Sequence, residues 1–230
     1  MVKRQVAETW LCNNFGKMET LYMKVLKTLV DVRASTCNDL LLLETGMPSL
    51  SVLIHEKRSK YLKNKLASLN PEAPLNLALT LAKSCNTLST KIIDSALLDH
   101  DQNDRLTDRN RLVEKVTSNI ESSKRKTYIH LNPNFQTPDM YSDKFVPEIT
   151  RRAFSRFRLS SHRLRIETGR WSRTPKELRL CPCKCIQDEE HVLLFCPYTR
   201  DIRTLFNVNH TSLSSSFYDK TITNLKKLEK

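Results

Sequence analysis

The stretch Cys181-Pro182-Cys183-Lys184-Cys185, followed by His191 and by Cys196-Pro197, decides how the rest of the sequence is interpreted. Four of the seven cysteines of the chain lie in it. Thiolates and an imidazole on two short arms are the ligands of a tetrahedral zinc site. His191 and Cys196 have a typical ligand spacing, whereas the first arm offers one cysteine more than a four-ligand site needs. The residues alone therefore predict a metal site and leave the ligands of its first arm open.

A chance cluster of buried thiols, or a disulfide pair, is the alternative interpretation of these cysteines. Free cysteines usually scatter along a chain, and Met1-Val2-Lys3-Arg4 is followed by polar residues rather than by the apolar core of a secretory signal. We therefore expect an intracellular protein, nuclear or cytoplasmic and not secreted. In such a reducing compartment cysteines are held by a metal more often than in disulfides.

The composition favours helices. Only 3 of the 230 residues are glycines, so few positions tolerate the positive φ that many turns need. The same scarcity excludes a glycine-rich phosphate loop and a dinucleotide fingerprint, and with them the common nucleotide-binding enzymes. No apolar run reaches the length of a membrane span. We expect a mainly α fold, with neither a membrane nor a small-molecule substrate as its partner.

The charge predicts a polyanionic partner. The formal net charge is +13, and ten basic residues stand against two acidic ones between positions 151 and 180. Arginines interleaved with aromatic rings suit phosphate contacts and base stacking. We expect Phe154 and Phe157 to lie in the core. We expect RNA or DNA to bind, mainly through its phosphates, at Arg151, Arg152, Arg156, Arg158, Arg163, Arg165, Arg170, Trp171 and Arg173.

Hydrophobic periodicity predicts a succession of helices. They cover residues 20–32, 40–45 with Gly46 as the stop, 50–69, 75–98 and 112–120, and another follows Pro197. Ser160 or Ser161 is expected to cap a short helix from His162 that Gly169 ends. Turn-forming residues between 122 and 147 suggest a linker. The expected organisation is a helical lobe at 1–125, a linker at 126–147, basic helices with the zinc loop at 148–207 and a loosely ordered tail at 208–230.

Two parts of the chain resemble a known family. The run from Leu159 to Trp171, followed by Arg179-x-Cys181-x-Cys183 and by the run from Gln187 to Pro197, is similar to the C-terminal zinc-knuckle-like segment of non-LTR (LINE-type) retrotransposon reverse transcriptases. Upstream, Ala7-Glu8-Thr9-Trp10 and the run from Glu44 to Leu50 resemble the helical region that follows the polymerase thumb in the same polyproteins. These matches span most of residues 7 to 206.

The resemblance implies a CCHC ligand set. The family pattern falls on Cys183, His191 and Cys196, with Cys181 as the remaining thiolate. Cys185 departs from the pattern and is an alternative ligand for either cysteine of the first arm. The polymerase carboxylates and the endonuclease domain of the family have no counterpart in this sequence. The resemblance therefore implies a retroelement-derived C-terminal region that does not polymerise.

Four functions are compatible with these features. The first is a non-catalytic, zinc-stabilised module that grips RNA or DNA through arginines. A protein-interaction scaffold built from the N-terminal helices, and a decayed fragment without activity, are the alternatives. The last is a zinc hydrolase with Asp188, Glu189 or Glu190 as general base. The ligand set disfavours this function, because thiolate-rich zinc sites are usually closed and structural.

Overall fold

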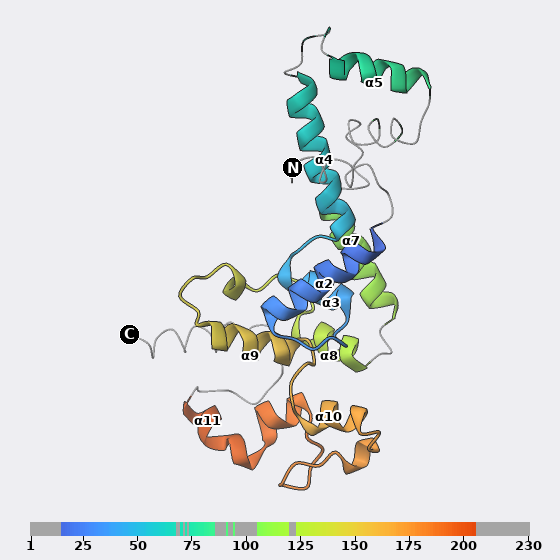
Figure 1. Cartoon of the computed structure of the whole chain (residues 1–230). Coiled ribbons are helices and arrows are strands. Elements are labelled where there is room, and N and C mark those ends of the chain that lie inside the picture. Colours follow the sequence, from blue (N-terminus) through green and yellow to red (C-terminus); the bar gives the residue numbers. More distant parts are fainter. Residues whose placement is uncertain are drawn as a thin grey trace. The chain divides into compact units, whose positions relative to one another are not determined.

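The computed structural model describes residues 15–67, 70, 72, 74–85, 91, 94, 105–119 and 123–205. Over these residues the chain is mainly helical and contains no strand; one isolated antiparallel bridge joins Leu180 to Ile186. Within them, no helix is both long and apolar enough to cross a bilayer. The helices labelled in Figure 1 are α2 (Gly16–Val30), α3 (Asn38–Thr45), α4 (Leu50–Ala67), α5 (Pro74–Ser84), α7 (Arg105–Ser118), α8 (Ser123–Leu131), α9 (Glu148–Arg158), α10 (Arg165–Trp171) and α11 (Arg200–Leu205). The expected mainly α fold is confirmed.

Four single turns complete the described structure. They are the 3₁₀ turns η2 (Asp139–Tyr141), η3 (Lys176–Leu178) and η5 (Pro197–Thr199), and the π-helical turn η4 (His191–Phe195). The predicted helix over 75–98 lies partly outside the described residues, and the predicted tail at 208–230 lies wholly outside them.

The chain forms two compact units. One consists of residues 1–22 and 48–111, and the other of residues 23–47 and 112–230. These units do not follow the expected division at 125 and 148, and α8 and η2 lie inside the stretch expected to be a linker. The division into a lobe, a linker, a zinc module and a tail stays a prediction.

Two helix boundaries follow directly from the chemistry of the sequence. The helix around Leu40 to Leu43 ends where it was expected, because Gly46 takes the left-handed conformation at φ 66° and the Oγ1 of Thr137 would lie 2.7 Å from any Cβ there. In the first unit, Ser49 precedes α4. Its backbone N–H and its hydroxyl both donate to the carboxylate of Asp108, at 2.7 and 2.9 Å, which ties the start of α4 to α7.

The predicted helix from His162 to Gly169 is wrong at both ends. Helix α10 begins at Arg165, because the hydroxyl of Ser160 lies against Glu189 and that of Ser161 accepts a hydrogen bond from the backbone N–H of Arg33. Gly169 lies inside α10 rather than after it. A Cβ at this position would meet the side chain of Arg179 at 2.6 Å, so the glycine serves a close approach.

The core of the second unit is built around α3. All four leucines from Leu40 to Leu43 are buried, although they point in different directions around the helix. A helix that is apolar on every side is surrounded by protein, and the buried side chains of Tyr128, Leu131, Met140, Val146 and Leu159 complete this core. The sequence places one charged residue, Glu44, at the end of this apolar run.

Glu44 is fully buried, and an ion pair and three hydrogen bonds hold its carboxylate. Arg158, itself only 4% exposed, forms an ion pair with it at 2.7 Å between Nε and Oε1, and its Nη2 donates to Oε2 at 3.0 Å. The hydroxyls of Tyr128 and Tyr141 donate to the same carboxylate at 3.1 and 3.4 Å. Burial raises the pKa of Glu44, and the positive charge of Arg158 opposes this rise. The pair fastens α9 to α3.

We expect Glu44→Ala to lower the free energy of unfolding of the second unit by about 3–5 kcal/mol, because it leaves the guanidinium of Arg158 buried without its counter-ion. Urea denaturation followed by tryptophan fluorescence measures the change. Glu148→Ala is the matched control, since Glu148 pairs with Arg152 at the surface; it should cost less than about 1 kcal/mol. Similar destabilisation in the two variants would show that the buried pair does not hold α9.

Candidate metal centre

Three thiols and one imidazole converge at the C-terminal end of the second unit. The Sγ atoms of Cys181, Cys183 and Cys196 and a ring nitrogen of His191 all lie within 4.8 Å of one another. Cys181 and Cys196 approach to 3.6 Å between their sulfur atoms, and the Sγ of Cys183 lies 3.0 Å from the Nε2 of His191. Cys181, His191 and Cys196 are buried and Cys183 is half-buried. Cys185, the alternative ligand, is exposed and does not belong to this group.

A tight hairpin forms the first arm. The bridge between Leu180 and Ile186 closes it, and the backbone N–H of Cys181 donates to the carbonyl of Cys185 at 2.8 Å. Lys184 takes a left-handed conformation at φ 70° and donates its backbone N–H to the carbonyl of Cys181 at 2.8 Å. This turn explains how two cysteines one residue apart both reach the cluster, while Cys185 remains part of the hairpin frame.

A single π turn forms the second arm. The backbone N–H of Cys196 donates to the carbonyl of His191 at 2.7 Å, so the turn places the two candidate ligands of this arm close together. Its first residue is held by the carboxylate of Asp188, which accepts the backbone N–H of His191 at 2.8 Å. The spacing of these two ligands therefore reflects one wide helical turn.

The four side chains fit a tetrahedral metal ion. At metal–ligand distances of about 2.3 Å for sulfur and about 2.0 Å for nitrogen, two sulfurs lie about 3.8 Å apart and a sulfur and a nitrogen about 3.5 Å apart. The observed 3.6 Å between Cys181 and Cys196 is close to the first value, and the 3.0 Å between the Sγ of Cys183 and the Nε2 of His191 is shorter than the second. The sulfur–sulfur distance is far from the disulfide length of about 2.05 Å, and all six cysteines in the described part of the chain are free thiols.

The thiols differ in their readiness to lose a proton. Burial raises the pKa of the Cys181 thiol. A hydrogen bond with the backbone of Cys185 lowers the pKa of the Cys183 thiol. A metal binds the thiolate form and releases the proton on binding, so a bound ion would overcome the unfavourable burial of a charge at Cys181.

The segment between the two arms holds the arginine-rich stretch that precedes them. Gln187 accepts the backbone N–H of Ile166 on its carbonyl at 3.1 Å and that of Arg165 on its side chain at 3.0 Å, so it fixes the start of α10. The buried carboxylate of Glu189 lies 2.8 Å from the Nε2 of His162. Burial raises the pKa of Glu189, but its contact with His162 outweighs this effect and leaves the pKa lowered.

An apolar contact joins the second arm to the helices of the core. Leu194, in the π turn between His191 and Cys196, packs in one cluster with Leu131 of α8. Phe154 and Phe157 of α9 pack against this cluster, as expected for core residues. The turn between the two candidate ligands of this arm thus also contributes Leu194 to the apolar cluster that Phe154 and Phe157 of α9 contact.

The predicted nucleic-acid-binding residues lie in three different environments. Arg158 is buried against Glu44, and we leave it out of the proposed surface for this reason. Arg151 and Arg170 are half-buried, and Arg170 pairs with Glu167. Trp171 is 50% exposed, but the guanidinium of Arg33 lies over its ring at 3.4 Å. The exposed members of the predicted set are Arg152, Arg156, Arg163, Arg165 and Arg173.

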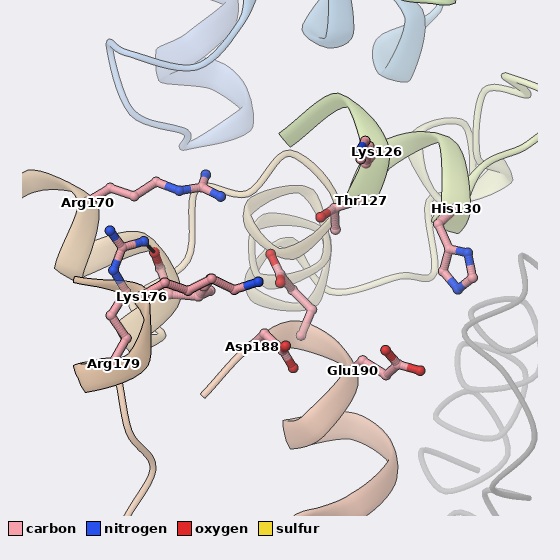
Figure 2. Close-up of a pocket in the computed structure, with 10 residues that line it drawn as sticks. Lys126, Thr127, His130, Arg170, Lys176, Arg179, Asp188 and Glu190 are labelled. Atoms are coloured by element: carbon pink, nitrogen blue, oxygen red, sulfur yellow. Dashed lines mark hydrogen bonds between the residues drawn. The ribbon is translucent and has the colours of Figure 1, made fainter. Parts of the chain in front are cut away.

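A pocket of about 540 Å³ lies next to the second arm (Figure 2). In this view Arg170, Lys176 and Arg179 lie on the left, and Asp188 and Glu190 lie below and to the right. Basic and acidic side chains are therefore nearly balanced around it. Asp188 and Glu189, two of the carboxylates expected as a general base in the hydrolase hypothesis, have the structural contacts described above.

Several residues that build the site were not predicted from the sequence. Gln187 and Glu189 act through backbone and side-chain contacts with the stretch around residues 160–166, and nothing in their spacing indicates this. Arg33 lies about 130 residues away in the chain and reaches the same stretch through the carbonyl of His162, at 2.5 Å. Only this contact between residues distant in the sequence identifies Arg33 as part of the site.

No protein-family model, no curated protein and no solved structure matches the chain. The resemblance to non-LTR retrotransposon reverse transcriptases therefore stays a prediction.

Metal binding should depend on Cys196 and not on Cys185. Titration with Co²⁺, whose thiolate complexes absorb in the near ultraviolet, reports sulfur ligation directly. We expect the wild-type protein and Cys185→Ser to give the same charge-transfer absorption, and Cys196→Ser to lose most of it because a buried ligand is removed. Loss of the signal in Cys185→Ser would assign the first arm differently.

Proposed function

We propose that this chain is a non-catalytic module in which a structural zinc ion orients a basic surface that binds RNA or DNA. The observation that carries the proposal is the double role of the second arm, which supplies His191 and Cys196 to the cluster and Leu194 to the core beneath α9. A metal bound there would fix the position of the arginine-rich stretch between α9 and α10.

Zinc is the metal that suits this donor set. Three thiolates and an imidazole in a tetrahedral arrangement select zinc over the hard cations, which prefer oxygen ligands. All four positions are filled by protein side chains, as in structural rather than catalytic zinc sites. Such a site contributes on the order of 10 kcal/mol of binding free energy to folding. That is sufficient to hold a short segment that contains little apolar core of its own.

The basic surface supplies the chemistry for binding. Exposed guanidinium groups bind phosphate oxygens in a bidentate manner, and they do so on any base sequence. The exposed arginines of the set lie on α9, on the loop at residue 163 and on and just after α10. We therefore propose phosphate-dominated binding with little sequence preference, in keeping with the predicted origin as a C-terminal region of a retrotransposon reverse transcriptase.

A protein-interaction scaffold is the second candidate, and one observation favours it. Leu21, Val25 and Leu29 follow one another at helical spacing on α2 and are all exposed. A stripe of this kind is a usual feature of helices that pack against a partner. Under this proposal the net charge would serve solubility alone, and nucleic-acid binding would be absent.

Salt dependence of binding tests the proposal. Fluorescence anisotropy with a labelled single-stranded RNA, repeated with single-stranded DNA of the same sequence, should show affinity that falls steeply with salt. In the double variant Arg165→Ala/Arg173→Ala, the slope of log K against log salt should decrease by about 0.7 for each phosphate that the variant no longer neutralises.

The matched control is Lys17→Ala/Lys24→Ala, which removes two exposed positive charges from α2. The affinity of this control should stay within about twofold of wild type. Equal weakening in both double variants would mean that net charge alone attracts the nucleic acid. Absence of any binding at low salt would favour the scaffold.

A further inference from the structure

A second pocket, apart from the metal cluster, is lined by three arginines from distant parts of the second unit. It has a volume of about 390 Å³. Arg33 comes from the segment after α2, Arg156 from α9 and Arg163 from the loop before α10. Asp31 is the one acidic residue that lines it. Three guanidinium groups against one carboxylate leave an excess of positive charge around a space large enough for a small ligand.

Arg33 is held rigidly at this pocket. Its backbone N–H donates to the hydroxyl of Ser161 at 2.8 Å, and its Nη2 donates to the carbonyl of His162 at 2.5 Å. Its guanidinium lies over Trp171 at 3.4 Å from the ring centre. The Nη1 atom is buried and has no hydrogen-bond partner within the described structure. This arginine is therefore positioned in advance by its contacts with Ser161, His162 and Trp171.

The three arginines repel one another in the absence of an anion. Burial lowers the pKa of Arg33, and the positive charges of Arg163 and Arg156 lower it further, against the opposing charge of Glu167. Asp31 relieves this repulsion only in part, because it pairs with Arg156 and lies 3.9 Å from Arg152. Like charges brought together without compensation cost free energy, and a bound anion removes that cost.

The remaining walls of the pocket suit a nucleotide rather than a bare ion. Ala153 and Phe157 give it an apolar side, and the ring of Phe157 packs at 5.4 Å from that of His162. Guanidinium groups next to an aromatic ring are the combination that binds a phosphate together with its sugar or base.

We propose that this pocket binds a phosphate group of a polynucleotide, with Arg33, Arg156 and Arg163 as its ligands. The inference rests on the proposed nucleic-acid binding and deepens it, because it replaces a diffuse basic surface by one defined phosphate site. Asp31 positions Arg156, whose Nε donates to the backbone carbonyl of Asp31 at 2.9 Å. Ser161 and Trp171 position Arg33.

Arg163→Gln tests the site with the smallest risk to folding, because the side chain of Arg163 is exposed. Single-stranded RNA dodecamers with a 5′-phosphate or a 5′-hydroxyl are the probes, and fluorescence anisotropy is the readout. Because one charge-assisted hydrogen bond to phosphate is removed, we expect about tenfold weaker binding than wild type and a salt slope reduced by about 0.7. Lys144→Gln, an exposed lysine outside the pocket, is the control and should stay within about twofold.

The two dodecamers identify the source of the phosphate. Weaker binding of the 5′-phosphorylated dodecamer alone would assign the pocket to a terminal phosphate, and equal weakening of both would assign it to an internal phosphodiester; both outcomes support the site. Equal affinities of Arg163→Gln and Lys144→Gln for both dodecamers would overturn it.

A second measurement separates failure of the pocket from failure of the proposed function. Trp171 lies against Arg33 and reports on it, and Trp10→Phe leaves Trp171 as the single tryptophan. Titration of this variant with adenosine 5′-monophosphate should change the fluorescence, whereas adenosine should not. A response without RNA binding would keep the pocket and reject polynucleotide binding. Equal responses to the two ligands, or none to either, would overturn the phosphate site.

Discussion

Three thiols and an imidazole lie within 4.8 Å of one another in a segment of sixteen residues, and this convergence is the constraint on which the C-terminal part of the second unit depends. Neither arm has an apolar core of its own: one is a hairpin closed by a single bridge, and the other is one π turn. Between them, Gln187 and Glu189 hold the stretch around residues 160–166. The segment between the two arms is therefore joined by hydrogen bonds to the start of α10 and to the loop before it.

The buried ion pair of Glu44 and Arg158 holds α9 against α3. Helix α9 carries one arginine inward to this pair and several outward, and Phe154 and Phe157 rest on the cluster that contains Leu194. A single helix is thus tied to α3 by an ion pair and to the second arm of the cluster by apolar contact. This double attachment holds the helix that carries Arg152 and Arg156 at the surface.

Local chemistry in the sequence predicts a large part of this structure. The stop at Gly46, the mainly helical fold and a cluster of first-arm cysteines with His191 and Cys196 follow from residue types and spacing, because each depends on interactions within a few residues. The residues alone left open which of Cys181, Cys183 and Cys185 join the cluster, since this depends on the left-handed turn at Lys184. The burial of Arg158, the start of α10 at Arg165 and the place of Arg33 depend on partners that are distant in the sequence. Periodicity carries no information about such contacts.

Hydrogen–deuterium exchange of the whole protein, with zinc bound and after chelation, tests the central claim most directly. If the metal holds the second arm beneath α9, chelation should accelerate exchange not only in residues 181–196 but also in α9 and at the start of α10, because the packing of Leu194 and the contacts of Gln187 are then released. Unchanged protection of α9 and α10 after complete removal of the metal would contradict the account, since the basic surface would then be held without it.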